Sequence, residues 1–344
     1  MKNLELLITK AWQEKSLMLA TLAPLSALYG VMGRVRKFLY DKDKLAKYHA
    51  PIPVMIIGNI TVGGSGKTPL IIALVKYLQG KGVNVGVISR GYGRVDSSPA
   101  LVREGSTPKE VGDEPCLIVG ETGVPMAVGA NRGGAIEILL ENYPNLQLII
   151  SDDGLQHYAL HRDVEWIVVD GVRGFGNEKL FPQGFLREPL DRLNGATVIY
   201  HDSRAEKYDN NALLMHLSPD NPMPLLGNDK SVNDETLPPQ KVYAVSGIGY
   251  PARFFKTLNE LGFGVVERAF GDHHDFTLDD LTDLTDLTDL PIITTSKDAV
   301  KLRELAKRHN HTIFDNVWVL PVQAVLAESV YEEMDRVLLK LGIG

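Results

Sequence analysis

A glycine-rich turn between a predicted strand and a predicted helix constrains this chain more than any other segment. The apolar run 54–57 predicts a buried strand, and apolar residues recur at helical spacing over 70–78. The turn between them, residues 61–68, contains three glycines and ends in Gly66-Lys67-Thr68. This pattern is typical of a phosphate-binding loop, because glycines let backbone N–H groups converge on phosphate oxygens at a helix N-terminus. Thr61 stands where the usual pattern has its first glycine.

Each part of this loop has an expected role in holding a nucleotide. We expect Lys67 to reach the β- and γ-phosphates and the hydroxyl of Thr68 to bind Mg²⁺. The predicted nucleotide contacts are Thr61, Val62, Gly63, Gly64, Ser65, Gly66, Lys67 and Thr68.

A second apolar strand, predicted to begin at 146, ends in Asp152 and Asp153. Phosphate-loop folds hold Mg²⁺ beside the nucleotide with an aspartate at such a strand end. Because Mg²⁺ keeps several waters and needs few protein ligands, one of these two carboxylates would bind it directly or through water. Gln156 and His157 follow on the same turn, where ordinary loop polarity is the alternative interpretation.

Strands and helices alternate along most of the chain, which predicts a parallel sheet with helices on both faces. We predict an α/β fold: a P-loop NTPase-type parallel sheet domain with N-terminal membrane-surface helices, and a smaller α/β C-terminal domain joined by a linker. A proline-rich stretch separates the two halves. The expected ranges are 1–40 for N-terminal helices that belong to the first domain, 41–205 for the nucleotide-binding domain, 206–240 for the linker, 241–325 for the smaller domain and 326–344 for a C-terminal helix.

The uncharged, largely apolar stretch 16–33 has basic residues on both sides. A spanning helix needs about 20 strongly apolar residues, and Pro24 and Gly30 interrupt this stretch. Two interpretations stay open. One or two helices lie on a membrane surface with the basic residues at the headgroups, or a helical hairpin packs on its own domain.

The composition argues against one class of binding partner and excludes two kinds of cysteine site. The formal net charge of −7 argues against nucleic acid, which attracts basic proteins. The single cysteine, Cys116, excludes an internal disulfide and a multi-cysteine metal site.

Three further loops carry charged groups whose role the residues alone leave open. Arg90 lies on a glycine-flanked loop after a predicted strand, where it could meet an anion or only solvent. The pair Asp113-Glu114 before a proline is usually a helix-entry pattern. The run 272–275, Asp-His-His-Asp, could be a metal site, an acid–base element or a solvated turn.

Five motifs together resemble the tetraacyldisaccharide 4′-kinases, which act in lipid A synthesis. They lie at 58–69, 89–94, 112–115, 152–157 and 272–274. The resemblance covers essentially the whole chain. Phe185 and Gly271 stand where the family often has proline, which bears on local loop shape.

The resemblance implies a kinase that uses ATP and Mg²⁺ to phosphorylate the 4′-hydroxyl of a tetraacylated glucosamine disaccharide 1-phosphate. The acceptor is then a membrane glycolipid. The resemblance favours attachment of the N-terminal segment to the cytoplasmic face of the bacterial inner membrane. We expect a monomer that binds no nucleic acid.

The resemblance also implies roles for single residues. Asp113 is the expected base, paired with one of the two histidines at 273–274, of which we favour His273. Lys67 and Asp153 complete the catalytic set, and Thr68 and Asp152 are the expected metal ligands. The candidate substrate contacts are Arg90, Arg132, Gln156, His157 and Arg187.

Two other classes of protein serve as alternatives. A P-loop GTPase or metallochaperone needs Asp-x-x-Gly and Asn-Lys-x-Asp motifs. Here Ser151 stands three residues before Gly154, and Asp298 comes one residue too early after Lys297. A non-catalytic, nucleotide-gated membrane scaffold would bind ATP without phosphorylating an acceptor.

Overall fold

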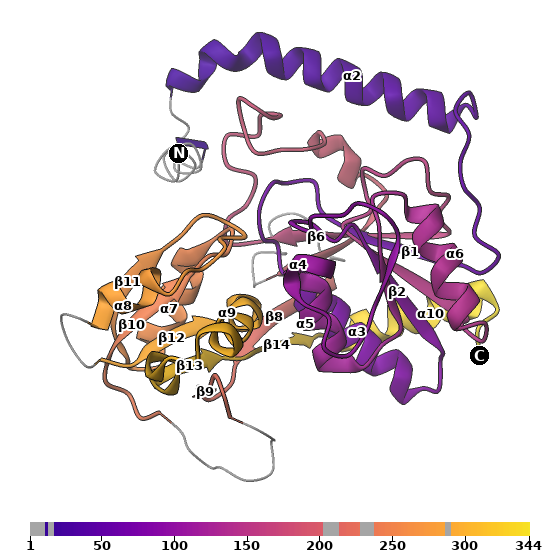
Figure 1. Cartoon of the computed structure of the whole chain (residues 1–344). Helices are drawn as coiled ribbons and strands as arrows, with labels where there is room; N and C mark the ends of the chain where they lie inside the picture. Colours follow the sequence, from indigo (N-terminus) through magenta and orange to yellow (C-terminus); the bar gives the residue numbers. More distant parts are fainter. Residues whose placement is uncertain (1–10, 13–16, 202–212, 228–236, 286–289) are drawn as a thin grey trace.

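The computed structural model describes residues 11–12, 17–201, 213–227, 237–285 and 290–344. Parts of the predicted ranges 1–40, 41–205, 206–240 and 241–325 therefore lie outside the described residues. The described chain forms a nine-stranded and a five-stranded sheet, each with its own helices (Figure 1).

The nine-stranded sheet has the order β14-β8-β7-β6-β1-β5-β2-β4-β3. Neighbouring strands from β8 to β4 run parallel, whereas β3 pairs antiparallel with β4 and β14 with β8. The strands are β1 Val54–Gly58, β2 Val85–Ser89, β3 Ala100–Val102, β4 Met126–Val128, β5 Leu148–Asp152, β6 Val164–Asp170, β7 Thr197–His201, β8 Leu213–Pro219 and β14 Val322–Leu326.

Helices cover both faces of this sheet because the buried residues of β1 point alternately to either side. Met55 and Ile57 share a core with α3 (Lys67–Gly80), α5 (Asp113–Thr122) and α10 (Glu328–Leu341). Val54 and Ile56 share a core with α6 (Arg132–Asn142). The short helix α4 spans Pro108–Val111. The parallel α/β domain predicted from the sequence is confirmed.

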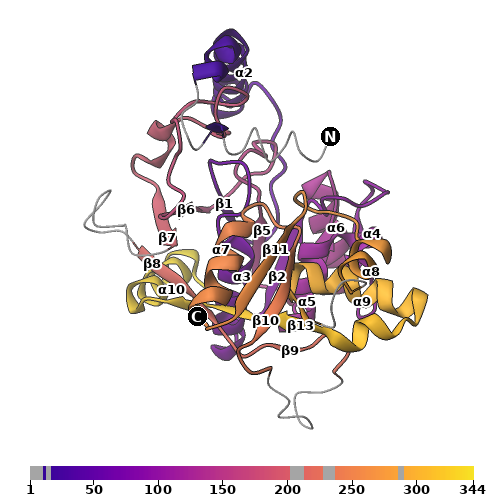
Figure 2. The same ribbon diagram turned by 90° about the vertical axis from the view of Figure 1, so that its left-hand side faces the viewer.

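The five-stranded sheet has the order β11-β10-β12-β13-β9. Its strands are β9 Met223–Pro224, β10 Lys241–Ser246, β11 Gly264–Ala269, β12 Ile292–Thr295 and β13 Val317–Leu320. One face packs on α8 (Asp279–Thr285) and α9 (Ser296–His309), and the other on α7 (Pro251–Glu260). The five-stranded sheet and these helices form the smaller α/β unit, seen in front of the larger sheet in Figure 2. Short 3₁₀ helices occupy Thr312–Asn316 in this unit and Leu190–Leu193 in the larger domain.

Two chain segments differ from the expected domain ranges. Strand β8 falls in the range predicted as linker, yet it extends the larger sheet beside β7. Strand β14, which begins within the range predicted for the smaller domain, pairs with β8 instead of continuing the smaller sheet. Helix α10 follows it back, and Val330 and Met334 enter the core of the larger domain. The boundaries at 205 and 325 therefore need correction: apolar periodicity identifies a strand, whereas its partner depends on packing between distant segments.

The N-terminal helix α2 (Ala23–Asp41) follows a 3₁₀ turn, Leu17–Leu22, and lies along the top of the molecule, apart from both sheets (Figure 1). The residues 175–187 hold it, since the Ser26 hydroxyl donates to the Leu180 carbonyl at 2.9 Å. Its large apolar side chains are exposed: Leu25, Leu28, Val31, Met32, Val35 and Phe38. By length and composition alone, Met18–Asp41 could cross a membrane, and 11% of its most apolar window is buried. A hairpin packed on its own domain does not fit this exposure.

Candidate active site

The phosphate-binding loop has the backbone shape that its glycines predict. Gly63 and Gly66 have φ of +93° and +90°, a region that favours glycine. A Cβ on Gly66 would lie 2.8 Å from the Met215 side chain, and one on Gly63 would lie 2.7 Å from the Arg173 guanidinium. Larger residues would therefore strain the loop and displace its neighbours.

The first part of the loop is fixed by the long segment after β6. The Val62 N–H donates to the Phe185 carbonyl at 2.7 Å, and Arg173 Nη1 donates to the Val62 carbonyl at 2.6 Å. The hydroxyl of Thr61 accepts a hydrogen bond from the Asn59 side chain at 3.3 Å. Thr61 thus supports the shape of the loop from below.

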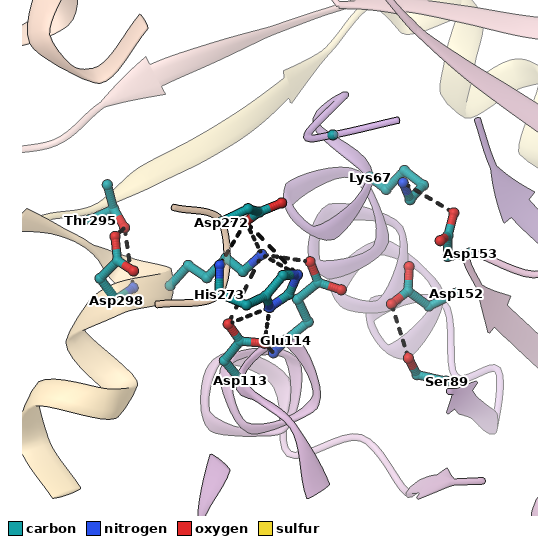
Figure 3. Close-up of polar contacts among 12 residues, drawn as sticks. Lys67, Ser89, Asp113, Glu114, Asp152, Asp153, Asp272, His273, Thr295 and Asp298 are labelled. Carbon is teal, nitrogen blue, oxygen red and sulfur yellow. Dashed lines mark hydrogen bonds and ion pairs between the residues drawn. The ribbon is translucent and has the colours of Figure 1, made fainter. Parts of the chain in front are cut away.

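The loop and the two aspartates lie at the same edge of the sheet. Strands β1 and β5 are parallel neighbours, and Ile57 pairs with Asp152. The Lys67 ammonium lies 3.2 Å from one carboxylate oxygen of Asp153 (Figure 3). Arg187 Nη1 donates to the other oxygen at 2.8 Å. Burial opposes ionisation of Asp153, but these two cations outweigh it and hold its pKa well below the usual range.

Asp152 differs from Asp153, because within the described part of the chain only Asp153 forms ion pairs, with Lys67 and Arg187. Asp152 is fully buried, and its Oδ2 accepts a hydrogen bond from the Ser89 hydroxyl at 3.2 Å. Its Oδ1 is buried and has no hydrogen-bond partner among the described residues, as is true of the Ser65 hydroxyl. Burial raises the pKa of Asp152, and the nearby charge of Glu114 raises it further. A buried carboxylate oxygen without a partner, beside a phosphate-binding loop, suits a divalent cation.

The described residues contain no group of three or more His, Cys, Asp and Glu side chains that could hold a metal. Mg²⁺ commonly has only one or two protein ligands, because its remaining ligands come from water and phosphate. Thr68 is the second residue of α3, directly after the phosphate-binding loop.

A second polar cluster joins the two domains. Asp113 is the first residue of α5 and is 4% exposed. Both of its carboxylate oxygens lie within hydrogen-bond distance of His273 Nδ1, at 3.0 and 3.1 Å (Figure 3). His273 comes from the loop after β11 of the smaller sheet. The Asp–His pair is therefore assembled across the domain boundary.

The pair shifts the pKa of both its members. Burial opposes ionisation of Asp113, but the hydrogen bond from His273 and the charge of Lys297 outweigh it and hold the pKa of Asp113 well below its usual range. Burial also disfavours the imidazolium form of His273, yet the bond to Asp113 raises the pKa of His273 overall.

His274 is separated from this pair. Its Nε2 lies 2.9 Å from Asp280 within the smaller domain, and its ring stacks on Phe270 with centroids 4.6 Å apart. Of the two adjacent histidines, His273 alone contacts Asp113 in the described chain.

One cavity reaches both clusters, through Lys67 and Asp153 of the first and His273 of the second. It is lined by the phosphate-binding loop, by His273 and by all five candidate substrate residues: Arg90, Arg132, Gln156, His157 and Arg187. Arg132 is almost fully buried and donates to the Gly129 carbonyl at 2.7 Å. Gln156 donates to Glu188 at 2.7 Å. Burial, helped by the charge of Arg132, lowers the pKa of His157 to about 4, which keeps this ring neutral at pH 7.

Two cross-domain contacts were not predicted from the sequence. Lys297, in the first turn of α9, lies 3.0 Å from Glu114 and 3.3 Å from His273 Nε2. On the other side of the loop, Arg253 of α7 donates to Asp170 at 2.6 Å and contacts His201 Nδ1 at 3.1 Å. The position of Lys297 directly after a strand end was the available signal, but its partners lie on distant segments.

Comparisons with known proteins agree along nearly the full length. A model of the LpxK family, tetraacyldisaccharide-1-P 4′-kinase, matches residues 18–339. A tetraacyldisaccharide 4′-kinase of Psychrobacter cryohalolentis is 54% identical over 99% of this chain and 98% of its own length. A tetraacyldisaccharide 4′-kinase of Actinobacillus pleuropneumoniae is 43% identical over 96% of this chain and 99% of its own length.

A solved structure agrees as well. The crystal structure of the "apo" form of LpxK from Aquifex aeolicus in complex with ATP superposes with a TM-score of 0.71 at 28% identity. The match covers 94% of this chain and 99% of that one.

Proposed function

This chain belongs to the tetraacyldisaccharide-1-P 4′-kinase family, and from that membership we propose how its side chains carry out the reaction. The protein is a kinase of lipid A biosynthesis that uses ATP to phosphorylate the 4′-hydroxyl of a tetraacylated disaccharide 1-phosphate. A GTPase, a metallochaperone or a non-catalytic scaffold does not fit a chain that matches such kinases along its whole length.

The observation that supports our assignment of residues is the shared cavity of Lys67 and His273. Transfer to a hydroxyl needs a phosphate cradle and a proton acceptor close to one another. Lys67 and the amides of the loop come from the larger domain, and His273 comes from the smaller one. If the two domains move relative to each other, the site is complete only when they close. Transfer would then depend on closure, and hydrolysis of ATP would be limited while the site is open.

The Asp113–His273 pair is the proposed base. A sugar hydroxyl is a poor nucleophile and loses its proton as it attacks. With the proton of His273 on Nδ1, facing Asp113, Nε2 carries the lone pair that can accept the proton of the hydroxyl, and His273 lines the cavity. Asp113 then offsets the charge of the imidazolium that forms, and it keeps the ring oriented.

Lys67 is the proposed electrophilic partner of the transferring phosphoryl group. Its ammonium is held by Asp153, which Arg187 in turn holds at 2.8 Å. This chain of ion pairs aims Lys67 toward the loop amides, where charge develops during transfer.

Thr68 and Asp152 are the side chains that would hold Mg²⁺, and the partnerless Oδ1 of Asp152 fits that role. The metal, when bound, neutralises charge on the phosphate oxygens. Asp152 must be ionised to bind it, so the surrounding cations Lys67 and Arg132 matter for keeping that carboxylate charged.

The acceptor is proposed to meet the arginine-rich wall of the cavity. Arg90, Arg132 and Arg187 would contact its anionic headgroup, and Gln156 and His157 its polar groups. The exposed apolar face of α2 is proposed to lie in the cytoplasmic face of the inner membrane, which keeps the acyl chains of the acceptor in the bilayer. The Tyr29 hydroxyl of α2 donates to the Arg187 carbonyl at 3.2 Å, which links this helix to the site.

A transfer assay tests this assignment. Labelled ATP is incubated with the purified chain and a lipid A disaccharide precursor in mixed micelles, with GTP as the control nucleotide. We expect transfer from ATP to the glycolipid, and a strong loss of turnover in Asp113→Ala with ATP binding kept. Near-normal turnover in that variant would remove Asp113 from the base.

Membrane attachment and oligomeric state are tested separately. We expect the chain to co-sediment with anionic vesicles, and a variant with Leu28 and Phe38 changed to Ser to stay in solution. Analytical ultracentrifugation in detergent is expected to give a monomer.

A further inference from the structure

We propose that Lys297 is a positioning residue of this reaction. It fixes the tautomer of His273 whose Nε2 can accept a proton, and it fastens the smaller domain onto the N-terminal turn of α5. The inference rests on the proposed role of the Asp113–His273 pair.

The contacts of Lys297 determine where the proton of His273 resides. A lysine ammonium donates hydrogen bonds and cannot accept them. Its Nζ lies 3.3 Å from His273 Nε2, so this nitrogen is the acceptor and carries a lone pair. The proton is then on Nδ1, which faces the carboxylate of Asp113. An imidazolium, with a proton on both nitrogens, could not accept at Nε2.

The same ammonium joins the two domains. Lys297 lies on α9 of the smaller domain, 3.0 Å from Glu114 of α5 and 3.4 Å from Asp272 on its own domain. When an acceptor hydroxyl replaces the ammonium as the donor to Nε2, Lys297 keeps these two carboxylates. The domain contact therefore persists while Nε2 becomes available to the substrate.

A second lysine on the same face of α9 supports this arrangement. Lys301, one helical turn further on, lies 3.6 Å from Asp113 and 3.4 Å from Asp298. Both ammonium groups thus face the carboxylates at the start of α5. Without Lys297, Glu114 and Asp272 would lose their nearest cation, and the negative charge around His273 would be less balanced.

The charge around His273 sets the sign of the expected pH effect. The titratable groups that face it are Asp113 and Glu114 from α5, Asp272 from its own loop, Lys297 and Lys301 from α9, and Tyr92, whose ring centroid is 4.6 Å away. Removing one ammonium from this set makes protonation of the pair easier. The acid limb of the rate profile should therefore move to higher pH.

The test compares Lys297→Met with Lys297→Arg and with Lys109→Met as a matched control. Lys109 also forms an ion pair across the domains, 3.6 Å from Asp275, but both side chains are largely exposed and neither touches His273. The readouts are kcat and KM over pH, the Kd for ATP and the thermal midpoint.

We expect Lys297→Met to lower kcat about tenfold with the Kd for ATP unchanged, and to shift the acid limb upward by about one pH unit. Lys297→Arg keeps the charge and should restore the limb. Lys109→Met should match the unmodified protein in both. If Lys297→Met fails to fold, Lys297→Gln should shift the limb in the same direction.

An unshifted limb in Lys297→Met or Lys297→Gln, whatever the rate, would overturn the inference and leave Lys297 a structural contact. Failure of the proposed base has a different signature. In that case His273→Gln itself would keep near-normal turnover and the unmodified limb.

Discussion

The two clusters of the cavity are built in opposite ways. The phosphate cluster, Lys67 with Asp153 and Asp152, lies on adjacent strands and a loop of one sheet. The proton cluster joins Asp113 to His273, which are 160 positions apart in the chain and belong to different domains. The first is fixed by a single core, whereas the second exists only when the domains meet.

Because the clusters are built differently, we expect substitutions in them to have different effects on ATP binding and on kcat. A change in the phosphate cluster should alter both the binding of ATP and the rate, because its groups are proposed to contact the nucleotide in the ground state as well as in the transition state. A change in the proton cluster should lower kcat while ATP still binds, because its groups are proposed to act on the acceptor hydroxyl during transfer.

The largest expected effect breaks the proton cluster. His273→Gln and Asp113→Asn should each lower kcat by about 10²–10⁴-fold, the usual contribution of a positioned acid or base. The double variant should lose little more than either single one, because the two residues act as a unit. Steady-state kinetics with isothermal titration of ATP checks this. Additive losses, or a weakened Kd for ATP, would contradict the comparison.

Lys67→Met breaks the phosphate cluster instead. Loss of one donor to developing charge typically costs about 10²–10³-fold in kcat. The Kd for ATP should rise as well, since the variant lacks the proposed phosphate contacts of Lys67 and leaves Asp153 with Arg187 as its only close cation in the described chain. An unchanged Kd for ATP would show that both clusters act only in the transition state.

Arg187→Gln sharpens the comparison with a smaller effect. Arg187 supports Lys67 through Asp153, and such supporting contacts are worth about 10–100-fold. We expect a loss in that range, together with a higher KM for the glycolipid. Arg187→Lys should recover little, because a lysine lacks the planar fork of the guanidinium. Full recovery in Arg187→Lys would reduce the role of Arg187 to its charge.

The smallest effect concerns pH. His273 has a raised pKa, so the base form is filled only above the ordinary value of 6.5. The rate should therefore fall about tenfold per pH unit below that limb, and His273→Gln should abolish the limb. The Asp113–His273 ion pair also stabilises the fold, and this stabilisation depends on pH in the opposite direction from the rate. Its contribution from His273 is complete below 6.5 and is lost as pH rises through the raised pKa, and that from Asp113 is lost only in strong acid.

Local patterns predicted much of the larger domain. The glycines of the loop, the strand before it and the aspartates after β5 placed the phosphate cluster, because each depends on neighbours within a few residues. By contrast, β8 fell in the predicted linker and β14 began in the range predicted for the smaller domain. Local patterns could not assign either strand to the larger sheet, since their pairing connects segments about 100 positions apart.

The sequence alone determined a strand, a glycine-rich turn and a helix with two aspartates at a second strand end, because each of these patterns depends on residues that are neighbours in the chain. Tertiary structure decided which histidine meets Asp113 and which lysine meets that histidine. Those contacts depend on how two separately built cores pack against each other, and a pattern of neighbouring residues holds no record of that packing.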